Sequence, residues 1–152
     1  MSNVNIRYLQ LALAQLDILL RREIWRWQLA GQNPDDALRG QYISEEEVLG
    51  LLERPLATSW GQTVALSAEV QHEVDLTLQQ VQAQVGQFSD QHHDQLRLCQ
   101  LVQEFDLSPF EQNIILLALA PALDLGYERI YGYLQDDVTR RYPTLNLALS
   151  LF

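Results

Sequence analysis

The sequence predicts an all-α protein: a multi-helix bundle with a long N-terminal helix and a helix-turn-helix-like C-terminal third. Three observations lead to this prediction. Apolar residues recur at steps of three and four in several segments, which is the period of one helix face. A Ser-x-x-Glu sequence precedes two of these segments, as is typical of helix N-termini. No alternation of apolar and polar residues is long enough for a strand, so residues 1–152 are expected to form a single helical domain.

Residues 4–30 are expected to form the first and longest helix, ending at Gly31 and Pro34. Trp25 and Trp27 are two positions apart in it and therefore point in different directions. Either this helix is buried on two sides, or one of the two side chains lies at a contact surface, which makes Trp25 and Trp27 the candidate partner-contact residues. The apolar stripe of the helix contains Ile6, Leu9, Leu13, Leu16, Leu20 and Trp27.

The middle of the chain is expected to contain three further helices. Ser44 and Glu47 fit a capping box at the start of a short helix that ends by Pro55, and residues 55–66 read as a loop. Ser67 begins a helix to about Val85, which Gly86 ends. Another helix is expected from about Asp90 to Phe105, with Phe105 on its buried face.

The C-terminal third begins with the sharpest local signal. Ser108, Pro109 and Glu111 together satisfy a capping box and the preference for proline at the first helical position. The helix that follows is apolar nearly all round and is expected to end at Pro121.

The next helix is predicted to run from about Asp124, its cap, to Arg141. Two acids at a helix C-terminus would oppose the helix dipole, whereas a continuous helix would pair Asp136 with Arg140 and Asp137 with Arg141. Its buried face would contain Tyr127, Ile130, Tyr131, Leu134 and Val138. Thr144 is expected to cap a last helix over residues 145–152.

Composition excludes several classes of function. The chain has a net charge of −10, ten arginines and no lysine, so it cannot form a P-loop, and a phosphate-backbone binder is disfavoured. His92 and His93 read as surface histidines, and Cys99 reads as a buried, inert thiol. No catalytic, cofactor or metal residues are predicted. A single cysteine, no signal peptide and no spanning segment together suggest a soluble cytoplasmic protein without membrane contact.

Three stretches carry a resemblance to a known family. They are YLQLALAQLDILLRREI (residues 8–24), the RGQYIS-EEEV block (39–48) and LSPFEQNIILLALAPALDLGYERIYGYLQDDVTRRYPTLNLAL (107–149). In this order they resemble the N-terminal region of the AAA+ ATPases that are encoded with phage-tail-like contractile injection systems. Residues 56–96 carry no such resemblance.

The resemblance implies a non-catalytic N-terminal domain, cut from a longer chain, that recruits substrates or adaptors. A winged-helix segment and an ATPase module would follow it, and ATP and magnesium are expected only in that missing module. The implied partners are the rest of the AAA+ polypeptide and components of the contractile particle. The isolated domain is expected to be a monomer, or a weak dimer through the helix that contains Ile6 and Trp27.

Two other functions compete with this one. Residues 108–141 could be a helix-turn-helix that binds nucleic acid. Its second helix, however, carries Glu128, Asp136 and Asp137 against three arginines, so its net charge is zero on an acidic domain. A free-standing helical adaptor, never attached to an ATPase, is the other alternative.

Overall fold

The computed structural model describes residues 3–30, 49 and 64–152, and in these residues there are helices and connections but no strand. The prediction of an all-α protein is confirmed for this part of the chain. The expected cap at Ser44 and Glu47 lies outside the described residues. The described elements are α1 (Asn3–Leu29), α3 (Ala68–His92), the 3-10 helix η2 (His93–Gln95), α4 (Arg97–Glu104), α5 (Pro109–Leu123), α6 (Gly126–Leu134) and α7 (Leu145–Leu151).

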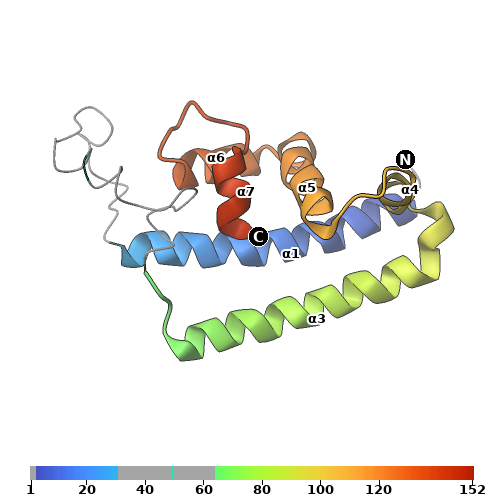
Figure 1. The fold of residues 1–152 in the computed structure, drawn as a ribbon, viewed down its shortest axis with the longest axis horizontal. Helices are drawn as coiled ribbons and strands as arrows, with labels where there is room; N and C mark the ends of the chain where they lie inside the picture. The colour runs from blue at the N-terminus through green and yellow to red at the C-terminus, as the bar shows by residue number, and fades with distance from the viewer. Residues whose placement is uncertain (1–2, 31–48, 50–63) are drawn as a thin grey trace.

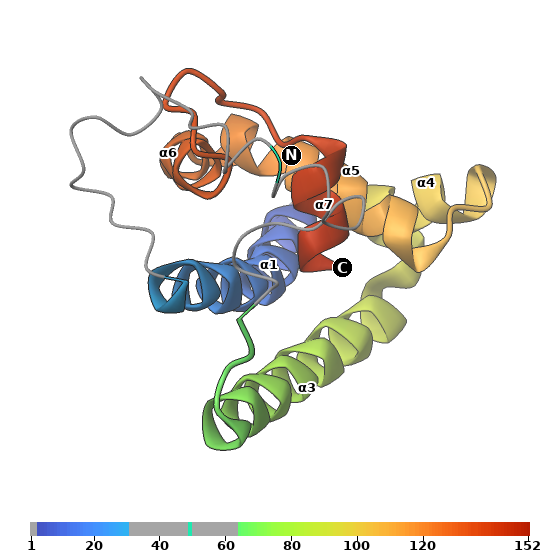
Figure 2. The ribbon, with the colours of Figure 1, turned by 60° about the vertical axis from the view of Figure 1, so that its left-hand side comes forward.

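The long helix α1 lies between two layers (Figure 1). Helix α3 runs along one side of it, and α5, α6 and α7 pack on the other, an arrangement that the turned view also shows (Figure 2). The apolar stripe predicted for α1 faces the layer formed by α5, α6 and α7. Ile6 is the exception, since it is 43% exposed. The main core gathers buried residues of α1, α5, α6 and α7: Leu16, Leu19, Leu20, Trp27, Leu117, Ala120, Tyr127, Tyr131, Leu134, Leu147, Ala148 and Leu151.

Helix α3 does not end at Gly86, as the sequence predicted, but continues to His92. Its start is as predicted, since the Ser67 hydroxyl accepts a hydrogen bond from the Val70 amide. A glycine within a helix costs roughly 1 kcal/mol relative to alanine. Packing offsets this cost, because Val85 and Phe88, on either side of Gly86, both lie against the buried cluster around Leu96.

The turn from α3 to α4 is attached to the first turn of α1 by one buried side chain. The Asn5 amide nitrogen donates to the Gln95 carbonyl at 2.9 Å, and its oxygen accepts from the Arg97 amide at 2.9 Å. After α4, Asp106 adopts a left-handed φ of 49°, and the Leu107 amide donates to the Val102 carbonyl, which is a Schellman motif. This ending leaves Phe105 65% exposed, contrary to its predicted burial.

Helix α5 starts as predicted. The Ser108 hydroxyl accepts a hydrogen bond from the Glu111 amide, and the Glu111 carboxylate accepts one from the Ser108 amide at 2.7 Å. The predicted end at Pro121 is wrong, since α5 includes Pro121 and continues to Leu123. The Pro121 ring lacks the N–H that would bond the Leu117 carbonyl, and the Tyr131 hydroxyl donates to that carbonyl instead, at 2.7 Å.

Helix α6 ends at Leu134, so its predicted continuation to Arg141 is wrong. Asp136 has a left-handed φ of 53°, and the Asp137 amide donates to the Gly132 carbonyl, which forms a second Schellman motif. The two aspartates therefore lie beyond the helix end rather than within it. Val138, predicted to be buried, is 90% exposed.

Asp124 and Thr144, the two residues predicted to cap the last two helices, both bond backbone amides at the starts of α6 and α7. Leu125 occupies the cap position of α6, and the Asp124 carboxylate beside it accepts a hydrogen bond from the Gly126 amide at 2.7 Å. Thr144 caps α7 through a bond from the Leu147 amide, as predicted. The three linked helices of the C-terminal third are therefore present, with the middle one shorter than expected.

Candidate protein-interaction site

The two tryptophans of α1 have different environments. Trp27 is 3% exposed, lies in the main core and contacts the Tyr133 ring at a centroid distance of 5.5 Å. Trp25 is 36% exposed and faces away from that core. The helix is thus covered on two sides, by α3 and by the layer of α5, α6 and α7, and Trp25 is still partly exposed. A partner contact at Trp25 stays a prediction.

Trp25 lines a groove between α1 and α3 that encloses about 400 Å³. We call it the Trp25 groove. Its apolar lining residues are Ala14, Ile18, Trp25 and Val74. Among the described residues, the lining consists of Ala14, Asp17, Ile18, Arg21 and Trp25 from α1 and Glu73, Val74 and Thr77 from α3.

The α1 side of the groove forms a second stripe, beside the one that builds the core. Ala14, Ile18, Arg21 and Trp25 are separated by four, three and four residues, which keeps them on one face of a helix. The apolar stripe predicted for this helix is the one that faces the core, and this second stripe was not predicted. The same spacing, counted from Trp25 backwards, could have identified it.

Hydrogen bonding connects the Trp25 groove to the main core. The Tyr127 hydroxyl donates to the Asp17 carboxylate at 2.6 Å. Burial raises the pKa of Tyr127, and the hydrogen bond to Asp17 and its charge raise that pKa further, so the phenol stays protonated. One edge of the groove is therefore fixed to α6, a packed element.

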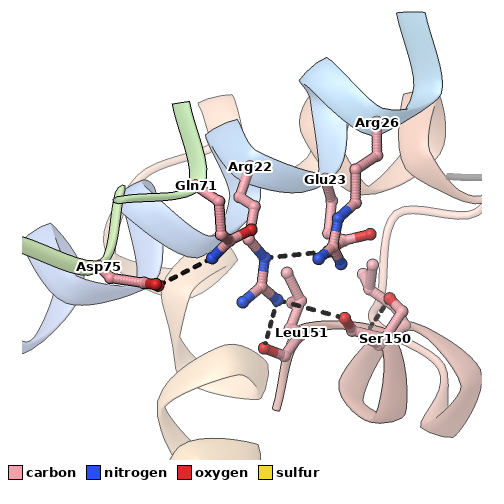
Figure 3. Close-up of polar contacts among 8 residues, drawn as sticks. Arg22, Glu23, Arg26, Gln71, Asp75, Ser150 and Leu151 are labelled. Atoms are coloured by element: carbon pink, nitrogen blue, oxygen red, sulfur yellow. Dashed lines mark hydrogen bonds and ion pairs between the residues drawn. The ribbon is translucent and has the colours of Figure 1, made fainter. Parts of the chain in front are cut away.

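A polar cluster lies on α1 between the groove and α7 (Figure 3). The Glu23 carboxylate is almost fully buried and accepts hydrogen bonds from Arg22 at 3.2 Å and Arg26 at 2.8 Å. Arg22 also donates to the Leu151 carbonyl at 2.8 Å and the Ser150 carbonyl at 3.4 Å. It thereby bonds the last carbonyl groups of α7 to α1. Figure 3 also shows the Gln71–Asp75 hydrogen bond on the nearby face of α3.

The Glu23 cluster connects α1 to the end of α7 through Arg22. Burial raises the pKa of Glu23, and the charges of Arg26 and Arg22 oppose that rise. Glu23 Oε2 has no hydrogen-bond partner among the protein groups, and the Glu23 side chain lines a void of about 10 Å³ with Gln135 and Ser150.

The other chemical candidates do not form a site in the described residues. His92 packs on the Phe88 ring, His93 hydrogen-bonds Gln103, and no group of three potential metal ligands occurs there. Cys99 is buried, as predicted, beside the Ser89 hydroxyl at 3.3 Å. Nor is any described helix both long and apolar enough to cross a membrane. Ser108 and Glu111 form the capping box of α5.

The helix-turn-helix alternative rests on α5, α6 and the arginines that follow them. Arg140 forms an ion pair with Asp137 at 3.5 Å, and Arg141 forms one with Glu128 at 3.7 Å. Each of these two exposed arginines thus has an acidic partner that offsets its charge.

A family model described as "Winged helix domain, variant" matches residues 3–152. The resemblance noted in the sequence placed a winged-helix segment after these residues, whereas this model matches the residues themselves. Its description names a domain family and neither an ATPase nor an injection system. No significant match was found among curated proteins or among solved structures.

Proposed function

The chain belongs to the family of variant winged helix domains, and we propose that it is a non-catalytic domain that binds protein partners through the Trp25 groove. Winged helix domains bind either proteins or nucleic acids. One observation carries the choice of proteins: a tryptophan that is 36% exposed lines an open groove of about 400 Å³ between two helices. Exposed aromatic side chains in concave surfaces are typical of residues that dominate binding energy.

Electrostatics supports proteins over nucleic acids as partners. The net charge of −10 repels a phosphate backbone over distances of about 10 Å at ordinary ionic strength. The lining of the Trp25 groove includes one basic residue, Arg21, and two acidic residues, Asp17 and Glu73. Such a mixed lining suits the polar rim of a protein interface.

The proposal includes a setting, which rests on the resemblance of residues 8–24, 39–48 and 107–149. In this setting the chain is the N-terminal domain of a AAA+ ATPase that serves contractile, phage-tail-like injection systems in the cytoplasm. ATP and magnesium would bind in the ATPase module, since this chain has no lysine for a P-loop. The domain would recruit components of the contractile particle, and by itself would be a monomer or a weak dimer.

The experiment uses the protein expressed from its complete gene. Its affinity for each purified protein of the contractile particle encoded beside it is measured, along with its affinity for duplex DNA at about 150 mM salt. We expect one particle protein to bind, and Trp25→Ala to weaken that binding at least tenfold. Leu76→Ala, a change at an exposed residue of α3 outside the groove, is the matched control and should have no effect.

Three results would contradict the proposal. Tight DNA binding with a steep salt dependence would favour the nucleic-acid alternative. Particle binding that Trp25→Ala leaves intact would move the site elsewhere. A complete gene without a Walker A motif would remove the ATPase setting and leave the adaptor alternative.

A further inference from the structure

We draw no further inference here: the strongest candidate, the groove of about 280 Å³ that Arg7 and Phe88 line between α1 and α3, is a surface for which nothing in the described residues shows an occupant.

Discussion

The Tyr131 hydroxyl lies 2.7 Å from the carbonyl oxygen of Leu117 and donates a hydrogen bond to it. That carbonyl is four residues before Pro121 and would otherwise be an unsatisfied buried acceptor within α5. Tyr131 is fully buried, and burial raises its pKa, with a further rise from the charge of Asp17. The phenol thus remains a donor at ordinary pH, and α6 repairs the defect that proline makes in α5.

Removal of this hydroxyl should destabilise the protein. We expect Tyr131→Phe to lower the free energy of unfolding by about 1–3 kcal/mol, because the Leu117 carbonyl loses its partner. In a Pro121→Ala background the cost should be smaller, since the new amide can bond the same carbonyl. Urea denaturation of the four proteins of this double-mutant cycle measures the coupling. Additive losses of stability would show that Tyr131 and Pro121 act independently. Tyr142→Phe, which removes a hydroxyl at a 74% exposed site, is the control.

Arg22 connects the end of α7 to α1, and its loss should also be costly. Its side chain is 15% exposed and donates to the Leu151 and Ser150 carbonyls as well as to Glu23. We expect Arg22→Ala to lower the free energy of unfolding by about 2–3 kcal/mol, the range for hydrogen bonds of charged groups. Arg21→Ala, at the exposed neighbouring position, should change it by less than about 0.5 kcal/mol. Similar losses in the two variants would contradict this role for Arg22.

Two glutamates should affect stability with opposite dependence on pH. The folded-state pKa of Glu23 is raised by burial, so its contribution is most favourable below its ordinary value of 4.5 and is lost as the pH rises through the folded value. The pKa of Glu111 is lowered by hydrogen bonds from the Ser108 side chain and backbone. Its contribution is present above 4.5 and is lost as the pH falls through the folded value.

Unfolding free energies measured from about pH 3 to about pH 7 test these two opposite pH dependences. With rising pH, the stability of the wild type relative to Glu23→Gln should fall. Over the same range, its stability relative to Glu111→Gln should rise. A rise in the Glu23 comparison would mean that the pairing with Arg26 and Arg22 outweighs burial.

Two glycine-to-alanine changes should have opposite effects. At Gly86, within α3, a Cβ atom would meet nothing within 4 Å, so we expect Gly86→Ala to stabilise the protein by about 0.5–1 kcal/mol. At Gly132 a Cβ atom would lie 3.2 Å from the Asp137 carbonyl oxygen and 3.4 Å from Val138 Cα. Gly132→Ala should therefore destabilise the turn after α6. Shifts of the denaturation midpoint in opposite directions would bear out both, and a destabilising Gly86→Ala would contradict the continuous α3.

Some of these structural features could be predicted from the sequence, and others could not. The core stripe of α1 and the caps at Ser67, Ser108 and Thr144 depend on local spacing, and they were predicted. The continuation of α5 through Pro121 depends on Tyr131, ten residues later, which no local pattern displays. The end of α6 was missed because aspartate, rather than glycine, takes the left-handed position of its Schellman motif.

The candidate site was predicted in part. The spacing of the two tryptophans indicated that they point in different directions, but the choice between them depended on which side of α1 receives α5, α6 and α7. The Trp25 groove needs α3 as its second wall, and nothing in the sequence paired residues 73–77 with residues 14–25. The polar lining of the groove, Asp17, Arg21 and Glu73, could not be distinguished from an ordinary solvated face.

The two tryptophans should separate stability from binding. Trp27 fills the main core, so Trp27→Ala should lower the free energy of unfolding by about 3–5 kcal/mol. Trp25 contributes to the groove instead, and Trp25→Ala should cost less than about 1 kcal/mol, as is usual for partly exposed sites. The same Trp25→Ala protein should lose at least tenfold in affinity for the particle protein that binds the wild type, measured at a temperature where both proteins are folded. A Trp25→Ala protein that is as unstable as Trp27→Ala would assign both rings to the core and remove the basis for a binding role of the groove.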